Sequence, residues 1–282
     1  MSKVAVVGAG TMGNGIAHVF AQHGWETSLI DVSQDALDRA VATIKQNLAR
    51  LEKKGAISYQ LSADTLGRIK TSTNLDTLDN VEFVVEAATE NPEIKFTIFH
   101  DLDRRAPPGA ILASNTSSIS ISEIAAQTRR PNAIVGMHFM NPVPVMTLVE
   151  IIRGKATSDD TVTKTVAIAK ELGKTPVEVN DAPGFVSNRV LMPMINEAIF
   201  CVQDGVATPQ AVDEVMKLGM SHPLGPLALA DLIGLDVCLS IMKVLQDGLD
   251  EQKYRPAPLL ERMVTAGKLG RKSGQGFYAY RD

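Results

Sequence analysis

The most informative stretch for the fold is Val4-Ala-Val-Val-Gly8-Ala-Gly10-Thr11-Met12-Gly13. Its apolar start predicts a short strand that is buried on both faces of a parallel sheet. The six residues that follow have the pattern G-x-G-x-x-G, and residues 15–23 are typical of a helix. Such glycines allow a tight turn and a close approach of a pyrophosphate, and the helix N-terminus attracts phosphates. The stretch therefore predicts a dinucleotide-binding loop.

A second strand is expected over residues 27–30, and Asp31 follows it directly. A carboxylate at this place would accept hydrogen bonds from an adenosine ribose and repel a 2′-phosphate, which favours NAD over NADP. The alternative is a structural glycine turn in which Asp31 caps a helix. We favour NAD binding, with contacts from Gly8, Gly10, Thr11, Met12, Gly13 and Asp31.

Strand and helix patterns alternate as far as Asp181. Further strands are expected at 81–86, 110–113, 133–139, 147–152 and 175–179, and helices at 34–54, 92–104 and 159–172. This alternation predicts an α/β, Rossmann-like doubly wound domain over residues 1–183. Helical patterns broken by glycine and proline follow, with one strand expected at 276–280. They predict an all-α C-terminal domain over residues 184–282.

The composition argues against several classes of partner. The net charge is −4 with no long run of like charge, so nucleic acid and anionic membranes are not expected as partners. Cys201 and Cys238 lie in apolar helical patterns and are interpreted as core thiols. No apolar run is as long as a membrane span, and the first strand leaves no room for a signal peptide, so we expect a cytoplasmic protein. We also expect no metal site.

A candidate acid–base pair lies in His138-Phe-Met-Asn-Pro-Val-Pro-Val-Met-Thr-Leu-Val-Glu150. The proline-rich turn would fold Glu150 back onto His138, which fixes the tautomer of the imidazole and raises its basicity. A buried structural bridge is the alternative. The other four histidines, His18, His23, His100 and His222, are interpreted as structural or solvated.

Two polar segments would complete such a site. Asn115-Thr-Ser117-Ser118 follows a buried strand at the edge of the sheet where ligands bind, and its hydroxyls would hold a substrate alcohol or carbonyl. A helix N-cap is the alternative for this segment. Asn188, at the start of the second domain, would donate to a polarised carbonyl, or it is a solvated or capping asparagine.

Together these motifs resemble the 3-hydroxyacyl-CoA dehydrogenase family, and within it the bacterial 3-hydroxybutyryl-CoA dehydrogenases. The resemblance covers nearly the whole chain and is carried by residues 8–13, 86–91, 114–118, 138–150, 183–189, 222–227 and 270–278. Met140 and Ser187 depart from the familiar pattern, which leaves the acyl chain length open.

The resemblance implies a role for each residue of the site. His138 is the acid–base, Glu150 orients it, and Ser117 and Asn188 hold the reacting oxygen. Cofactor contacts are implied for Glu90, Lys95, Asn115 and Lys272, although Lys95 and Lys272 alone would be interpreted as surface charges. Coenzyme A contacts are implied for Lys54 and Asn47, where the alternative is a solvated helix face.

The expected activity is NAD-dependent oxidation of (S)-3-hydroxyacyl-CoA, of short chain, to 3-oxoacyl-CoA, and the reverse reduction, by a homodimer. A dehydrogenase for 3-hydroxyadipyl-CoA is one alternative. A non-catalytic, dinucleotide-binding structural or sensor protein is the other.

Overall fold

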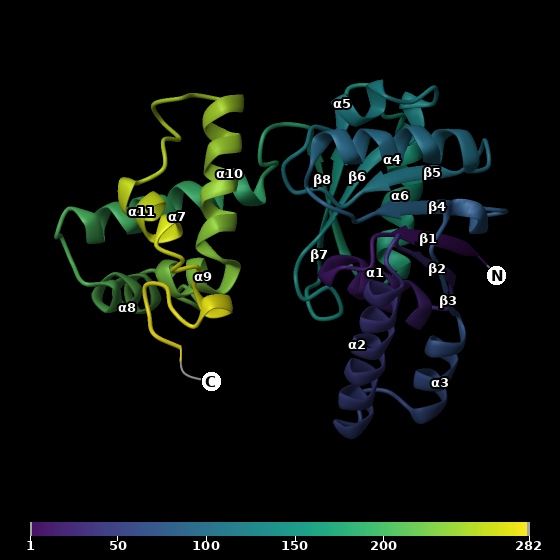
Figure 1. Ribbon diagram of the computed structural model, residues 1–282, viewed down its shortest axis with the longest axis horizontal. Helices are drawn as coiled ribbons and strands as arrows, with labels where there is room; N and C mark the ends of the chain where they lie inside the picture. The colour runs from purple at the N-terminus through teal and green to yellow at the C-terminus, as the bar shows by residue number, and fades with distance from the viewer. Residues whose placement is uncertain (1, 281–282) are drawn as a thin grey trace. The chain divides into compact units, whose positions relative to one another are not determined.

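The computed structural model describes residues 2–280 and forms two compact units, which divide between Asp181 and Ala182 (Figure 1). The first unit contains the sheet and the second is helical. Each is described by itself below.

The first unit is built on one eight-stranded sheet with the order β3-β2-β1-β4-β5-β6-β7-β8. The strands are β1 (Lys3–Val7), β2 (Glu26–Ile30), β3 (Ile69–Ser72), β4 (Phe83–Glu86), β5 (Ile111–Ser114), β6 (Ile134–Phe139), β7 (Leu148–Arg153) and β8 (Thr175–Asn180). Strands β3 to β6 are parallel, β7 pairs antiparallel with β6, and β8 is parallel to β7. The strand order reverses between β1 and β4, which is where open α/β sheets bind their ligands.

Helices cover both faces of the sheet. They are α1 (Thr11–Gln22), α2 (Gln34–Lys53), α3 (Tyr59–Gly67), α4 (Pro92–Arg105), α5 (Ile121–Ala126) and α6 (Asp159–Glu171). Figure 1 shows α4 and α5 on the opposite side of the sheet from α1. Alternate residues of the strands, such as Val4 and Val6, pack with Ile16 and Phe20 of α1 in one buried core. This packing fixes the start of α1 against the ends of β1 and β4.

Three details of the first unit differ from the sequence-based expectations. The first helix begins at Thr11 rather than residue 15, because Gly10 acts as its N-cap and its carbonyl accepts from the Asn14 N–H at 3.0 Å. Helix α3 and strand β3 were not predicted at all. Only Ser62 and Thr65 of α3 are buried, and no residue of β3 is fully buried, so neither shows an apolar period.

The second unit contains α7 (Ser187–Gln203), α8 (Pro209–Gly219), α9 (Pro226–Ile233), α10 (Leu235–Gly248) and α11 (Pro258–Thr265) around one apolar core. The strand expected at 276–280 is wrong: up to residue 280, this region makes only isolated bridges. The N–H groups of Phe277 and Tyr278 donate to the carboxylate of Asp231, so they are not available for a strand ladder. The α/β sheet domain followed by a helical domain is otherwise confirmed.

Two further expectations concern the thiols and the membrane. Cys238 is buried, and burial raises the pKa of its thiol to about 12, which agrees with an inert core cysteine. Cys201 and Cys238 are both free.

Within residues 2–280, no helix has the length and apolar character needed to cross a membrane.

Candidate active site

The turn between β1 and α1 is tight because two of its glycines touch backbone. Gly8 has φ +103°, and a Cβ there would lie 2.5 Å from the carbonyl oxygen of Ala87. A Cβ on Gly13 would lie 1.7 Å from the carbonyl oxygen of Gly8. Neither position therefore tolerates a side chain, and both hold the start of α1 against the end of β4.

Gly10 is different, because a Cβ there would meet no protein atom within 4 Å. Its φ of −68° is also accessible to any residue, so nothing in the protein itself requires glycine. The first turn of α1 has no acidic residue and no side-chain cap, and its N–H groups have no partner within the helix. This open, electropositive surface fits the pyrophosphate of a dinucleotide.

Asp31 ties this loop to the end of β2. Its Oδ2 accepts the Ala9 N–H at 2.8 Å and its Oδ1 accepts the Ser33 N–H at 2.9 Å. The N-cap of α2 is Ser33, so the alternative that Asp31 caps this helix is wrong. The carboxylate is thus held beside the glycine loop, where the ribose contact was predicted.

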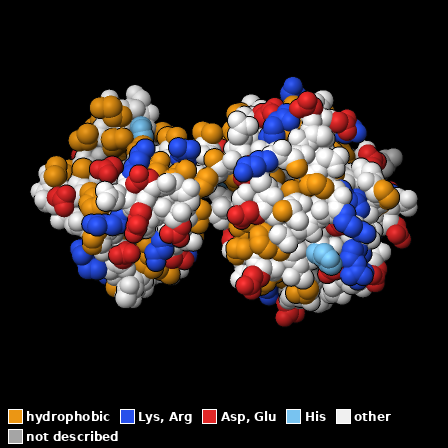
Figure 2. Space-filling view, turned by 90° about the horizontal axis from the view of Figure 1, so that it is seen from above, with side chains coloured by type: hydrophobic (Ala, Val, Ile, Leu, Met, Phe, Trp, Pro, Cys, Tyr) orange, Lys and Arg blue, Asp and Glu red, His pale blue; other side chains and the backbone are white. Residues whose placement is uncertain are grey.

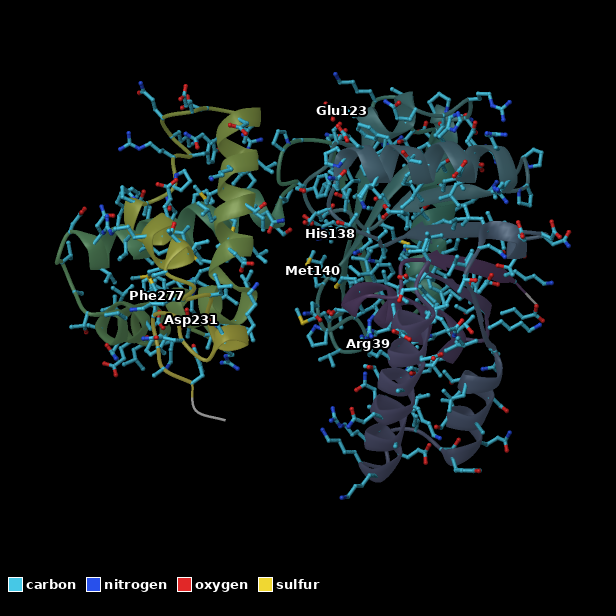
Figure 3. The ribbon with its side chains drawn as sticks, viewed as in Figure 1. Arg39, Glu123, His138, Met140, Asp231 and Phe277 are labelled. Atoms are coloured by element: carbon cyan, nitrogen blue, oxygen red, sulfur yellow. The ribbon has the colours of Figure 1, made fainter. Side chains whose placement is uncertain are left out.

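His138 and Glu150 face each other across the antiparallel strands β6 and β7. The two residues are direct register partners, and His138 Nδ1 lies 2.8 Å from Glu150 Oε2. They are 7% and 2% exposed, so the hydrogen bond is shielded from bulk water. Because Nδ1 is engaged by the carboxylate, Nε2 is the atom suited to proton exchange with a substrate. Figure 3 shows His138 and Met140 where β6 leads into the turn.

Ser117 is held by Glu90. The Ser117 N–H and Oγ–H donate to Glu90 Oε1 at 2.6 and 2.9 Å, and Thr116 Oγ1 lies 2.9 Å from Glu90 Oε2. The N-cap of α5 is Ser120, so the capping alternative for Asn115 to Ser118 is wrong for this helix. Glu90 thereby fixes a hydroxyl that was predicted to hold the reacting oxygen.

Asn115 links the end of β5 to β6. It is 9% exposed, and its Oδ1 accepts the N–H of Phe139 at 2.9 Å, one residue after His138. The side chain therefore fixes the backbone beside the candidate acid–base. A contact of Asn115 with the cofactor stays a prediction.

Lys95 is not a surface charge, so that interpretation of its sequence is wrong. It is 1% exposed, and its ammonium pairs with both carboxylate oxygens of Glu86, each at 2.7 Å. Glu86, which is fully buried at the end of β4, was not recognised as a site residue. The available signal was a carboxylate that directly follows the apolar run Phe83-Val-Val, because a buried carboxylate requires a partner.

Two candidate coenzyme A residues lie along α2. Asn47 is half-buried on the helix, and Lys54 is exposed at its C-cap, close in sequence to Arg50 and Lys53. The helix thus ends in a group of cations, as the sequence predicted. Their contact with a ligand stays a prediction.

Asn188 and Lys272 belong to the second unit. Asn188 is buried in the first turn of α7, whose N-cap is Val186, so the capping alternative is not supported. The Lys272 ammonium lies 2.6 Å from Asp236 Oδ1. Their proposed contacts with substrate and cofactor stay predictions.

Two family models match the chain. Residues 3–182 match the 3-hydroxyacyl-CoA dehydrogenase, NAD binding domain, and residues 184–280 match the 3-hydroxyacyl-CoA dehydrogenase, C-terminal domain. The chain belongs to the 3-hydroxyacyl-CoA dehydrogenase family.

Relatives of this dehydrogenase match over nearly their full length. A Bacillus subtilis (strain 168) protein named "Probable 3-hydroxybutyryl-CoA dehydrogenase" is 55% identical, covering 100% of this chain and 98% of the relative. The 3-hydroxybutyryl-CoA dehydrogenase of Bradyrhizobium diazoefficiens is 52% identical, and the match covers 100% of this chain and 96% of the relative. The crystal structure of (S)-3-hydroxybutyryl-CoA dehydrogenase PaaH1 from Ralstonia eutropha superposes with a TM-score of 0.97 at 50% identity, covering 100% of both chains.

The dehydrogenase is therefore an NAD-dependent oxidoreductase, and the expectation of NAD is confirmed. These matches give no support to a non-catalytic structural or sensor protein. The residues of the β1–α1 turn and Asp31 are the ones that would hold the pyrophosphate and the adenosine ribose.

The two kinds of glycine in the β1–α1 turn predict opposite responses to alanine. Gly10→Ala should leave the free energy of unfolding within about 1 kcal/mol of wild type. It should raise the Kd for NADH at least about tenfold, because the methyl group occupies the surface open to the pyrophosphate. Gly13→Ala should lower the free energy of unfolding by about 1–3 kcal/mol, because its Cβ collides with Gly8.

Urea unfolding and NADH fluorescence titration of both variants check this prediction. A Gly10→Ala variant that binds NADH as tightly as wild type would contradict the assignment of that surface to the cofactor.

Proposed function

We propose that this dehydrogenase interconverts (S)-3-hydroxybutyryl-CoA and acetoacetyl-CoA with NAD as the hydride acceptor. The observation that carries the chemistry is the buried hydrogen bond of 2.8 Å between His138 and Glu150 in direct strand register. The short-chain substrate is supported by the printed names of relatives that are 52% and 55% identical.

His138 is the proposed general acid–base. In the oxidation, Nε2 takes the proton of the 3-hydroxyl group while the C–H electron pair leaves C3 as hydride. Bound NAD supplies the electrophilic carbon that accepts this hydride. The products are the 3-oxoacyl thioester, NADH and one proton on His138, which then passes to solvent. Glu150 stabilises the imidazolium that forms, and a positioned base of this kind contributes roughly 10²–10⁴-fold to the rate.

Ser117 and Asn188 are proposed to hold the reacting oxygen. The reacting oxygen gives its only hydrogen to His138, so Ser117 is proposed to turn its hydroxyl hydrogen from Glu90 to that oxygen when the substrate binds. Asn115 is proposed to lie beside the nicotinamide, and Glu90, Lys95 and Lys272 are the further cofactor residues that the resemblance implies.

The coenzyme A portion is proposed to bind near the end of α2. Lys54 offers a point charge for its phosphates, and Asn47 offers an amide about two helical turns before it along α2. Residues 1–183 are proposed as the NAD-binding domain, and residues 184–282 as the domain for substrate and dimerisation. A cytoplasmic location belongs to the same proposal.

A homodimer is supported by the apolar surface of the second unit. Val206, Val215, Leu218 and Met220 are 61–82% exposed around α8, and Figure 2 shows hydrophobic side chains spread over this unit. Exposed apolar surface of this kind is typical of an interface. Light scattering coupled to size exclusion measures the mass, and a monomer would contradict the dimer.

The test of the proposed function is the loss of NADH absorbance when acetoacetyl-CoA is added. Rapid loss with the thioester and none with free acetoacetate would support both the reaction and the need for coenzyme A. No loss with acetoacetyl-CoA, although NADH binds, would contradict the short-chain substrate. Longer thioesters and 3-oxoadipyl-CoA then test the alternative substrates, with NADPH as the control for cofactor choice.

A further inference from the structure

A buried lysine of the first unit has no part in the proposed chemistry. Lys174 follows α6, where Gly173 with φ +69° ends the helix and leads the chain into β8. The lysine is only 9% exposed, and burial lowers the pKa of its ammonium. A buried charge is costly to desolvate unless it is hydrogen-bonded, so its acceptors show what it does for the fold.

The acceptors of Lys174 lie in the turn between β6 and β7. Its ammonium donates to the carbonyl of Val143 at 2.5 Å and to the carbonyl of Met146 at 2.8 Å. The N–H of Thr175, the next residue, donates to the carbonyl of Thr147 at 2.8 Å. This turn joins the strand of the candidate acid–base to the strand of its carboxylate partner. The lysine therefore fastens the connection between the two halves of the acid–base pair.

The same turn packs against α1. Val143 is 2% exposed, and a Cβ on Gly15 would lie 2.8 Å from the Cβ of Val143 and 3.6 Å from the Cδ of Pro144. The turn and the helix are thus in direct contact, with no room for a side chain between them. Helix α1 begins at the glycine turn that would hold the pyrophosphate. The contact therefore relates the place of the acid–base to the place of the cofactor.

We propose that Lys174 is a positioning residue, which sets the distance between His138 and the bound cofactor by holding the turn against α1. It acts through Val143, whose carbonyl it binds and whose side chain contacts the helix. Hydride transfer requires the reacting atoms to meet at about 3–3.5 Å, so a small shift of the turn slows it. The inference rests on the proposed function where turnover is its readout.

Lys174→Met tests the proposal, because it removes the ammonium and keeps an unbranched side chain. The enzyme–NADH complex is mixed with saturating acetoacetyl-CoA, and the first turnover is followed by stopped-flow NADH absorbance. The rate constant of this turnover should fall roughly 10–100-fold, the effect of a displacement of about 1 Å. The Kd for NADH should stay close to the wild-type value, because the glycine turn is unchanged.

The amplitude of the first turnover separates positioning from loss of folded protein. The amplitude counts active sites, whereas the rate constant reports the reaction within each of them. A smaller amplitude with the wild-type rate constant, or an unchanged rate constant, overturns the proposal. Lys170→Met is the matched control, because it makes the same change at an exposed position of α6 and should leave both quantities unchanged.

Gly15→Ala keeps the test decisive if Lys174→Met does not fold. It approaches the same contact from α1 while the lysine remains in place. The added Cβ must displace either the helix or the turn, because it would lie 2.8 Å from Val143. The rate constant of the first turnover should therefore fall roughly tenfold. A wild-type rate constant in this variant overturns the proposal.

Hydrogen exchange gives a readout that needs no turnover. The N–H groups of Val145 and Met146 both donate to the carbonyl of Pro142 at 2.9 Å within the turn. Amides of residues 140–147 should exchange faster in Lys174→Met than in wild type or Lys170→Met, as measured by mass spectrometry. Equal exchange in all three proteins overturns the proposal. Absence of turnover in the wild type would instead contradict the proposed function, while the exchange rates still decide whether Lys174 holds the turn.

Discussion

Replacement of His138 by alanine should lower kcat for reduction of acetoacetyl-CoA by roughly 10²–10⁴-fold, the usual contribution of a positioned acid–base. The Kd for NADH should stay close to the wild-type value, because His138 lies at the end of β6 and not in the turn that follows β1. Initial rates followed by NADH absorbance and a fluorescence titration of NADH measure the two quantities on the same preparation.

His100→Ala is the matched control for this prediction. His100 is exposed on α4, so its removal should change neither kcat nor the Kd for NADH. If His138→Ala bound NADH normally and kept wild-type kcat, the proton would have to be transferred by another group, and the proposed mechanism would be wrong.

The contact between His138 and Glu150 could be expected from the sequence because two local features favour it. Each residue lies in an apolar strand pattern, and the Asn-Pro-Val-Pro turn between them returns the chain antiparallel. A carboxylate in such a pattern is buried, and it requires a hydrogen-bond partner there. The strand register then places the imidazole opposite it. The nucleotide loop was also predictable from local sequence, because contacts with adjacent backbone require glycine at positions 8 and 13.

Other parts of the first unit lack such a signal. Helix α3 buries only polar side chains and β3 is a partly exposed edge strand, so periodicity of apolar residues could not reveal them. Lys95 was misjudged because its partner Glu86 lies nine residues away, and only the packing of α4 against the sheet brings the two together. Long-range pairing of charges is decided by tertiary structure and is not visible in local sequence.

The C-terminal segment gives the second large prediction, which concerns stability. Asp231 is 1% exposed and lies beside Phe277 (Figure 3). Its carboxylate accepts hydrogen bonds from the N–H groups of Phe277 and Tyr278 and from the hydroxyl of Tyr280, each at 3.0 Å. Burial and this last bond raise the pKa of Tyr280, so the phenol remains a donor at neutral pH. The carboxylate therefore anchors three points of the final turn.

Asp231→Ala should lower the free energy of unfolding of the second unit by about 3 kcal/mol, because it leaves several donors without their charged acceptor. Urea unfolding of the full chain measures this value. Asp247→Ala is the control: Asp247 is exposed on α10, so its loss should stay within about 0.5 kcal/mol.

In Asp231→Ala, the C-terminal segment should also open more often while the rest of the protein stays folded. Arg271 and Lys272 are exposed, and the segment around them is fastened by Asp231 from α9. Trypsin should therefore cut Asp231→Ala after these residues faster than wild type under conditions where both proteins remain folded. Equal rates of cleavage and equal unfolding would contradict the anchoring role.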